Sequence, residues 1–375
     1  MGETIDWRAL ESSALGGVLT AMSHTEQNRE YHGEGDVLTH TRMVCEALVR
    51  LPGYIALGEE DRFILLLAAL LHDIGKIRCT VIRDGALVSP RHSVVGAVMA
   101  RELLWRELGL CGTPAARRIR ESVCMLIRYH SYPPYAIKAE SPERRLLTVT
   151  SNGELADGFT IGRLCLLERA DVLGRICKDA RESLERVEYC EMMAEELGCT
   201  DRPYRFASAH SQRGYFVGRT DWRDDELYDD SWGEVILLSG LPGTGKDTLI
   251  AERYPELPTV SLDDIRRRLG ISPTEKQGRV VAEAHEQAKE YLRRHQPFVW
   301  NATNVTSQIR SKQISLFESY GASVKTLFIE TEWEEELRRN SARSAVVPRS
   351  VIERMLSRLE IPERHECRSV VWETT

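Results

Sequence analysis

Hydrophobic and polar positions follow different patterns in the two halves of this chain. In the first half, apolar residues recur at the three- and four-residue spacing of amphipathic helices, with proline and glycine between the segments. The segments that predict helices are Asp61–Leu71, Ser93–Leu108, Ala115–Arg128, Phe159–Cys177 and Arg181–Leu197. Strand signals in this half are weak and confined to residues 80–88. An all-α N-terminal module is therefore expected.

In the second half, short apolar runs alternate with helical stretches. The runs that predict strands are Val235–Leu238, Thr259–Ser261, Phe298–Asn301 and Thr326–Glu330. This alternation is typical of an α/β domain with a parallel sheet. The chain is therefore expected to be multidomain, with a helical domain at residues 1–200, a linker at 201–232 and an α/β domain at 233–375.

Composition and charge indicate more about the compartment and the partners of the protein than about its reaction. The formal net charge of −7 lies wholly before Gly233, because basic and acidic residues balance after it. No broad basic surface is expected, so a polynucleotide would have to bind in a local groove. The longest apolar run, Phe63–Leu71, is far too short to span a bilayer. Nine cysteines without C-x-x-C spacing, and no signal segment, favour a reduced, cytoplasmic protein without a membrane partner.

The apolar run at 235–238 breaks into a glycine-rich turn that matches the G-x-x-x-x-G-K phosphate loop. Backbone N–H groups of such a loop surround a polyphosphate, and Lys246 would contact the β- and γ-phosphates. The residues expected to bind ATP and Mg²⁺ are Gly240, Gly243, Thr244, Gly245, Lys246, Asp247 and Thr248. Asp247 stands where Ser or Thr usually binds Mg²⁺, so Thr248 or water would have to supply that ligand.

Histidines and aspartates gather on helix ends in the first half, where they are able to converge. The candidate metal ligands are His40, His72, Asp73, His92, His130 and Asp171. A mixture of imidazole and carboxylate favours a first-row transition metal over Mg²⁺ alone. Two such metals would share and acidify a water, giving a hydroxide aimed at phosphorus.

This pattern resembles the HD-domain superfamily of metal-dependent phosphohydrolases over roughly residues 30–180. The H…HD…D motif falls on His40, His72, Asp73 and Asp171, and His92 and His130 match the histidines that dinuclear members use for a second metal. The resemblance implies one or two divalent ions (Mn, Fe, Co, Ni or Zn) and a catalytic role for Asp73. It also makes Lys76, Arg175 and Lys178 candidates to hold substrate phosphate, the last two on the helical face of Asp171. His32 and Asp36 are either substrate contacts or ordinary surface residues.

Downstream of the phosphate loop, the segment VSLDDIRRRLG (260–270) follows a short strand. A carboxylate at the end of a parallel strand is well placed to accept the proton of a hydroxyl acceptor. Asp263 has this position, and Arg266 would face the same pocket and hold a phosphate of the acceptor. With the loop, this segment resembles the phage-type polynucleotide 5′-hydroxyl kinases.

Two further segments carry the same resemblance. In FVWNATNVT (298–306), Asn301 takes a place often held by Asp. RRNSARSAVVP (338–348) resembles the helical lid of that family, and Arg339 and Arg343 would reach over the ATP phosphates and stabilise transition-state charge.

Taken whole, the chain resembles the bacterial bifunctional enzymes that fuse an HD-domain phosphatase to a polynucleotide kinase. This implies a nucleic-acid end-healing enzyme. The first module would remove a 2′ or 3′ phosphate, or open a 2′,3′-cyclic one, and the second would move the γ-phosphate of a nucleoside triphosphate to a 5′-OH. RNA or DNA ends would be the substrates, and a nucleic-acid ligase would act next.

Two alternatives remain open. The first is an HD nucleotidase or cyclic-nucleotide phosphodiesterase fused to a small-molecule or nucleoside kinase, which the acidic net charge favours. The second is a non-catalytic sensor, in which nucleotide binding gates a degenerate HD site. The complete set of metal ligands, base and lid arginines argues against the sensor.

Overall fold

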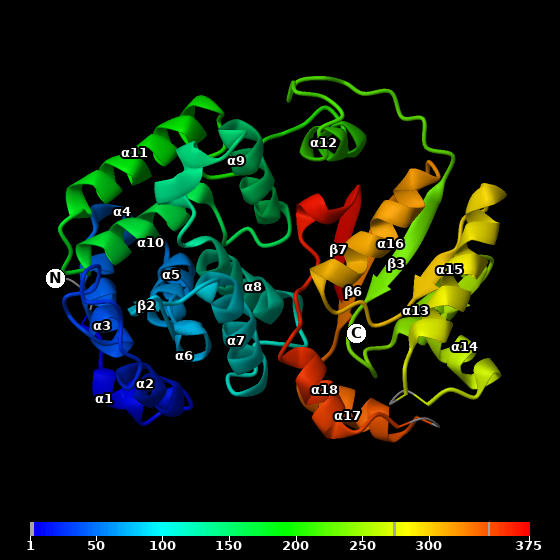
Figure 1. Ribbon diagram of the computed structural model, residues 1–375, viewed down its shortest axis with the longest axis horizontal. Helices are drawn as coiled ribbons and strands as arrows, with labels where there is room; N and C mark the ends of the chain where they lie inside the picture. The colour runs from blue at the N-terminus through cyan, green and yellow to red at the C-terminus, as the bar shows by residue number, and fades with distance from the viewer. Residues whose placement is uncertain (1–3, 273–274, 344–345) are drawn as a thin grey trace. The chain divides into compact units, whose positions relative to one another are not determined.

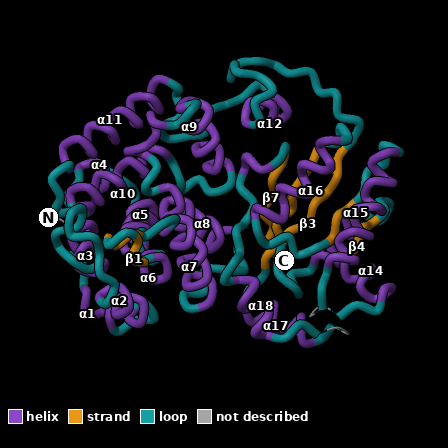
Figure 2. The backbone as a smooth tube through the Cα atoms, viewed as in Figure 1, coloured by secondary structure: helices purple, strands orange, loops and turns teal. Residues whose placement is uncertain are grey.

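A computed structural model describes residues 4–272, 275–343 and 346–375. Contacts within it define two compact units. The first contains the residues up to Leu110 together with Ala115–Tyr204, and the second contains Cys111–Pro114 and Arg205–Thr375. Helices fill the first unit, whereas most of the strands belong to the second (Figure 2).

The first unit is helical apart from one short hairpin among its described residues (Figure 1). Its elements are α1 (Trp7–Glu11), α2 (Gly16–Ser23), α3 (Val37–Leu48), α4 (Pro52–Ile55), α5 (Glu59–Leu71), α6 (Lys76–Cys79), β1 (Val81–Arg83), β2 (Ala86–Val88), α7 (His92–Arg106), α8 (Pro114–Tyr129), η1 (Pro133–Lys138), α9 (Pro142–Thr150), η2 (Ser151–Glu154), α10 (Ile161–Leu173) and α11 (Ala180–Glu196). The predicted all-α module is confirmed, and the weak strand signal at 80–88 corresponds to the antiparallel hairpin β1–β2.

Helix α5 forms the centre of the first unit. Its second half is buried on nearly every side, because α3 and α10 both pack against it. Helix α3 buries one stripe at three- and four-residue spacing, which includes Val37, His40, Val44 and Leu48. His40 thus lies on the core face of its helix rather than on the surface.

The second unit is a parallel sheet with helices packed against it. Its strands are β3 (Glu234–Ser239), β4 (Thr259–Ser261), β5 (Val299–Asn301), β6 (Ser323–Glu330) and β7 (Ser369–Thr374). Its helices are α12 (Ala209–Phe216), α13 (Lys246–Arg253), α14 (Leu262–Leu269), α15 (Gly278–Arg293), α16 (Ser307–Ser319), α17 (Trp333–Ser341), α18 (Arg349–Leu356) and η3 (Arg364–Glu366). The order β4–β5–β3–β6–β7, with every neighbouring pair parallel, confirms the predicted α/β fold.

Three local features differ from the sequence analysis. Strand β7 was not predicted, and the segment 201–232 contains helix α12 and belongs by its contacts largely to the second unit. The helix expected over Phe159–Cys177 is shorter, because α10 ends at Leu173 with Gly174 as its C-cap.

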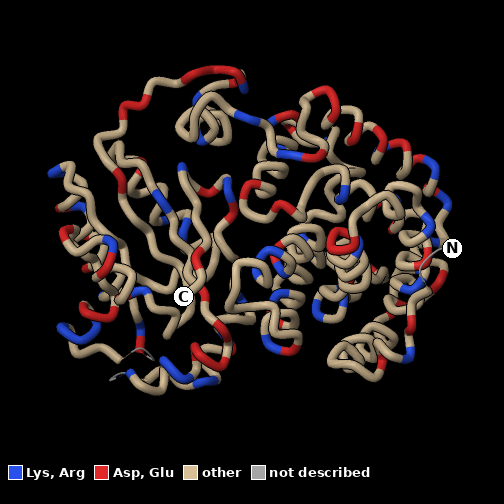
Figure 3. Tube along the Cα trace, turned by 180° about the vertical axis from the view of Figure 1, so that it is seen from behind, with Lys and Arg blue, Asp and Glu red and all other residues tan. Residues whose placement is uncertain are grey.

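Charged residues of both signs are interspersed along both units, and the segment before β3 is mostly acidic (Figure 3). No helix in the described part of the chain has the length and apolar character needed to cross a lipid bilayer.

Candidate functional site

In the first unit, two glycines allow the backbone approaches that assemble a cluster of histidines and aspartates. Gly75 follows the His72-Asp73 pair, and a Cβ atom there would lie 2.0 Å from the carbonyl oxygen of His92. Gly174 follows α10, and a Cβ atom there would lie 2.6 Å from the backbone nitrogen of Val44 on α3. The absence of side chains at these positions brings His92 beside Asp73, and brings the end of α10 close to α3.

The imidazole rings of the cluster present their Nε2 atoms to one another. The Nδ1 atoms of His72, His92 and His130 lie 2.7, 2.9 and 2.7 Å from the carbonyl oxygens of Ala69, Ser89 and Ile127. A carbonyl oxygen only accepts, so each Nδ1 carries the proton and each Nε2 keeps a lone pair. Nevertheless, Nε2 of His92 lies 3.2 Å from Nε2 of His130, and Nε2 of His72 lies 3.3 Å from Nε2 of His40.

Asp73 lies between these two pairs of histidines. Its Oδ2 is 3.3 Å from Nε2 of His72, and its Oδ1 is 3.4 Å from Nε2 of His92. Asp73 Oδ1 is buried and accepts no hydrogen bond from the described residues. Asp171 adds a second carboxylate, with Oδ1 2.9 Å from Nε2 of His40.

In the second unit, the turn after β3 forms a loop around the N-terminus of α13. Gly240 and Gly245 have φ angles of 147° and 84°, which only glycine adopts without strain. A Cβ atom at Gly240 would lie 2.4 Å from the carbonyl oxygen of Ile329. Lys246 folds back over the loop, and its Nζ donates to the carbonyl oxygens of Gly240 and Leu241 at 3.0 and 2.6 Å.

Asp263 is the second residue of α14, which follows β4 directly at the carboxyl edge of the sheet. Its Oδ1 accepts a hydrogen bond from Nη1 of Arg266, and its Oδ2 lies 3.3 Å from Nη2 of Arg343. Arg339 is linked to the phosphate loop through Thr375. Its Nη1 donates to Oγ1 of Thr375 at 2.8 Å, and that hydroxyl donates to the carbonyl oxygen of Thr244 at 3.1 Å. Asp263 thus contacts the predicted acceptor-binding arginine, Arg266, and one predicted lid arginine, Arg343, whereas Arg339 pairs with Glu335 and Thr375. Residues 344 and 345 of the lid segment lie outside the described residues.

Two family models match the chain. The HD domain model matches residues 37–156, and the AAA domain model, of the P-loop kinase-like type, matches residues 235–362. The chain combines an HD domain with a P-loop domain. No curated protein matches it. These domains fit a bifunctional enzyme with phosphohydrolase and kinase activities.

The donor atoms of the HD domain fit divalent transition metals. Among the described residues, three groups have ligand atoms within 4.8 Å of one another. The first is His32, Glu34 and His40, the second is His40, His72 and Asp73, and the third is Asp73, His92 and His130. Lone pairs of facing imidazoles repel one another at 3.2 Å unless a cation or a proton lies between them. Oδ1 of Asp73 also favours a cation at this place, because a buried carboxylate oxygen without a hydrogen-bond partner among the described residues destabilises the fold. Asp73 belongs to the second and third of these groups, so it could serve as a ligand in either.

The charge states in the HD domain favour ligation at most of these positions. Burial, with the neighbouring His92 and His72, lowers the pKa of His130 to about 3, so this ring is neutral at pH 7. Burial works against the ionisation of Asp73, but Lys76 and His72 outweigh it and hold the pKa of that carboxyl well below its usual range. At His40 burial is likewise outweighed, here by Asp171 and Glu34, which raise the pKa to about 9. A cation at Nε2 of His40 would replace that proton.

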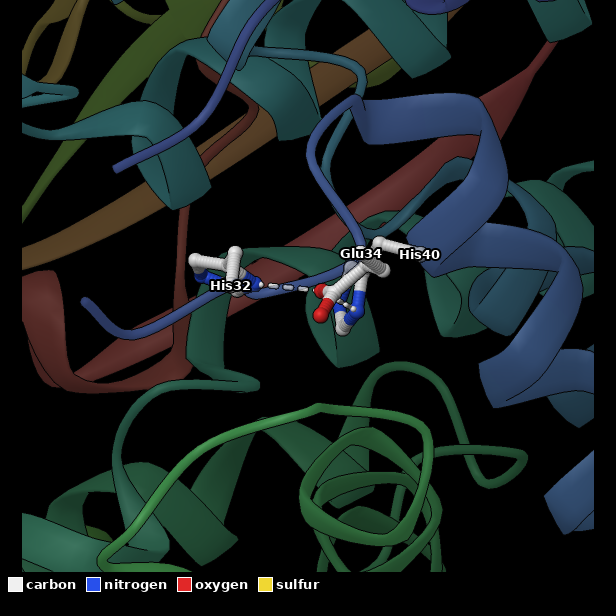
Figure 4. A group of neighbouring side chains, drawn as sticks. All are labelled: His32, Glu34 and His40. Carbon is white, nitrogen blue, oxygen red and sulfur yellow. Dashed lines mark hydrogen bonds and ion pairs between the residues drawn. The ribbon is translucent and has the colours of Figure 1, made fainter. Parts of the chain in front are cut away.

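Glu34 is a site residue that the sequence analysis missed. Its Oε1 lies 2.9 Å from Nδ1 of His32 and 3.0 Å from Nδ1 of His40 (Figure 4). Its Oε2 accepts a hydrogen bond from the backbone nitrogen of Ile176, which follows α10, at 3.0 Å. The side chain is buried, with 1% of its surface exposed. Only its spacing of two and six residues from His32 and His40 hinted at this role.

The other predicted HD residues fall into two groups. Nζ of Lys76 lies 2.7 Å from Oδ2 of Asp73, Nη2 of Arg175 lies 2.8 Å from Oδ2 of Asp171, and both cations line a pocket over the cluster. Lys178 does not line this pocket and is exposed. The helical placement of Arg175 and Lys178 was wrong, because α10 ends at Leu173 and both residues follow it. Of the two open positions, His32 lines the pocket, whereas Asp36 caps α3 by accepting from the backbone nitrogen of Thr39.

The predicted nucleotide-binding residues also differ in their surroundings. Thr244 is buried, and its hydroxyl donates to the carbonyl oxygen of Leu241. Asp247 and Thr248 are both exposed at the start of α13. Asp247 contacts Asn301, whose Nδ2 donates to Oδ1 of Asp247 at 2.7 Å.

Glu336 on α17 is a second residue that the sequence analysis missed. It is fully buried, and neither of its carboxylate oxygens has a hydrogen-bond partner among the described residues. Its backbone oxygen lies 2.8 Å from the position of a Cβ atom at Gly243, so α17 packs closely against the phosphate loop. Burial raises the pKa of Glu336 to about 8. Burial also lowers the pKa of Lys246 to about 8. In sequence, Glu336 was one acid in an ordinary helix start.

Proposed function

We propose that this chain is a nucleic-acid end-healing enzyme. The HD domain removes a 2′ or 3′ phosphate, including a 2′,3′-cyclic one, and the P-loop domain transfers the γ-phosphate of ATP to a polynucleotide 5′-OH. The observation that carries this proposal is the contact of Asp263 with both Arg266 and Arg343 at the carboxyl edge of the sheet. A base, a cation for the acceptor phosphate and a cation for the donor phosphates are thereby gathered around one point.

The kinase step follows from these groups. Asp263 accepts the proton of the 5′-OH as the oxygen attacks phosphorus. Lys246 leaves the carbonyl oxygens of its own loop for the β- and γ-phosphates, because charged oxygens are stronger acceptors. Arg343 leaves Asp263 in the same way and, with Arg339, neutralises the charge on the transferred group. Arg266 remains beside Asp263 and binds the phosphate on the 3′ side of the acceptor nucleotide. Mg²⁺ bound with the nucleotide supplies further neutralisation of charge.

The pocket of the HD domain supports a nucleotide end as its substrate. It has a volume of about 430 Å³, within the range of about 300–1,000 Å³ that is typical of small-molecule sites. Tyr31 and Tyr135 line it and remain 51% and 56% exposed. Exposed aromatic rings are platforms on which unpaired bases stack. A phosphate without a base would leave these rings without a role.

The protein groups of the HD domain divide the hydrolytic work. Lys76 and Arg175 line the pocket beside Asp73 and Asp171, so they orient the phosphate and balance its charge. Divalent metals held by the histidine–aspartate cluster supply Lewis acidity and lower the pKa of water. His32 presents its Nε2 3.4 Å from Nζ of Lys76 and thus forms part of the phosphate-facing wall.

The competing function is an HD nucleotidase joined to a small-molecule kinase. The two functions differ in how substrate length and salt concentration affect turnover. Binding of a polynucleotide releases counterions and therefore weakens as salt rises, whereas mononucleotide turnover does not depend on such release. We expect an oligoribonucleotide with a 5′-OH and a 3′ phosphate to be modified at both ends, with KM rising steeply between 50 and 200 mM salt. Turnover of mononucleotides alone, with flat salt dependence, would replace this proposal with the small-molecule one.

A further inference from the structure

The contact between Asp247 and Asn301 joins the two positions that normally share Mg²⁺ in a P-loop enzyme. Asp247 directly follows Lys246 in the first turn of α13, and Asn301 ends β5, the neighbour of β3 in the sheet. Nδ2 of Asn301 donates to Oδ1 of Asp247 at 2.7 Å. The nitrogen must face Asp247, since a carboxylate oxygen only accepts.

The chemical groups at these positions are exchanged relative to the usual P-loop arrangement. There, a Ser or Thr hydroxyl on the helix and an Asp carboxylate on the strand hold Mg²⁺. Here, the carboxylate is on the helix and the neutral group is on the strand, so the hydrogen bond runs in the opposite direction. The pair keeps the same formal charge, which neither substitution alone would preserve.

We infer that Asp247 supplies the protein carboxylate for the Mg²⁺ of the bound nucleotide and that Asn301 orients it. Oδ1 of Asp247 is held by Asn301, while Oδ2 has no hydrogen-bond partner among the described residues. The inference rests on the proposed kinase function. It excludes Thr248 as the replacement ligand, because the next residue of an α-helix points about 100° away around the axis.

The exchange has a consequence for nucleotide binding. A carboxylate on the helix directly follows Lys246, the residue expected to contact the β- and γ-phosphates. Without metal it repels them, and with Mg²⁺ it becomes a ligand. Binding of ATP should therefore depend more strongly on Mg²⁺ than it does when a hydroxyl occupies this position.

The test compares Asp247→Ser, Asn301→Asp and the double variant Asp247→Ser/Asn301→Asp, which restores the usual arrangement. ATP dissociation constants are measured by calorimetry on the full chain, with EDTA and with Mg²⁺, and Mn²⁺ binding to the ATP complex by electron paramagnetic resonance. We expect Asp247→Ser to bind metal-free ATP about tenfold more tightly than wild type and to lose most of the gain from Mg²⁺. The double variant should regain that gain. Asp264→Ser is the matched control, because Asp264 is an exposed carboxylate that pairs with Arg267 on α14.

Each result has a distinct meaning. If wild type binds ATP but Asp247→Ser keeps the full Mg²⁺ effect, or if Thr248→Ala loses it instead, the assignment of Asp247 is wrong and the kinase function stands. If wild type binds no ATP under either condition, the proposed kinase function itself fails. Circular dichroism shows that each variant is folded, and the double variant keeps the test valid if Asp247→Ser alone is unstable.

Discussion

The HD site and the P-loop site differ in how far the protein alone completes them. In the HD domain the candidate ligands are buried except for His92, whose side chain is 22% exposed, and the rings of His72, His92 and His130 are each fixed by a hydrogen bond from Nδ1. In the P-loop domain, Asp263 is 61% exposed, and Lys246 is hydrogen-bonded to its own loop. The first site holds its candidate ligands together without an ion, whereas the second would have to release internal hydrogen bonds to bind a nucleotide.

The difference follows from what each site binds. A metal ion is small, so its ligands must already be deprotonated and within a few ångströms of one another. A nucleotide carries its own charges, and these draw lysine and arginine side chains from internal partners. The buried carboxylates show the same contrast, since Asp73 has a lysine partner and Glu336 has no hydrogen-bond partner among the described residues.

The largest stability effect should come from Glu336→Gln. The folded-state pKa of Glu336 is about 8 and its ordinary value is 4.5, so the protein loses stability as pH rises from 4.5 to 8. The neutral amide removes this loss. We expect the free energy of unfolding of the variant, relative to wild type, to rise by about 3 kcal/mol between pH 4.5 and pH 7.

Thermal or denaturant unfolding of the full chain at a series of pH values measures this change. Glu334→Gln is the matched control, because Glu334 is exposed on the same helix. A stability difference between Glu336→Gln and wild type that is constant from pH 5 to pH 8 would show that Glu336 is ionised in the folded protein.

The next largest effect, on metal affinity, is expected from a substitution of Glu34. It tests whether the ligands of the HD site are positioned before the metal binds, in contrast to those of the P-loop site. Glu34 keeps the proton of His40 on Nδ1, which leaves Nε2 for a metal. In Glu34→Gln the amide nitrogen competes with that proton, so metal affinity should fall by about 10- to 100-fold. Calorimetric titration with Mn²⁺ of the full chain, after its metals have been removed with a chelator, measures this affinity directly.

The exposed Glu30 lies in the same loop, and Glu30→Gln serves as the matched control for the loss of charge. Equal metal affinities in Glu34→Gln and Glu30→Gln would mean that Glu34 only links the loop to the end of α10.

The smallest effect is expected at the mouth of the HD pocket. Tyr135→Ala should raise KM for a 3′-phosphorylated oligonucleotide about tenfold, because stacking of one base contributes about 1–3 kcal/mol. It should leave kcat unchanged, and it should not affect glycerol phosphate, which has no base. Tyr189→Ala is the control, since Tyr189 is similarly exposed on α11 but does not line the pocket. A parallel loss with both substrates would contradict the stacking role.

The sequence predicted the parts of the molecule that depend on local pattern. The buried run of β3 and its glycine turn were recognisable because strand, loop and helix follow one another directly. Asp73 and His72 were recognisable because they end an apolar helix. Both fold classes could be predicted from such patterns alone.

The remaining features depend on contacts between distant segments. The role of Glu34 requires the loop before α3 to meet His40 and the end of α10, which no periodicity encodes. In the sequence, Glu336 cannot be told apart from the exposed glutamates beside it, because its burial depends on the packing of α17 against the phosphate loop. Lys178 was misplaced because a glycine inside an apparently helical pattern ended α10 early.

The most direct test of the account measures both end reactions on one substrate. A 5′-OH oligoribonucleotide with a 3′ phosphate is incubated with labelled ATP, Mg²⁺ and Mn²⁺, and wild type is compared with Asp73→Ala and Asp263→Ala. We expect Asp263→Ala to lose 5′ labelling by about 10²- to 10⁴-fold and to keep phosphate release, and Asp73→Ala to do the reverse. Loss of both reactions in either variant, or no reaction by wild type at either end, would contradict two separate end-healing sites.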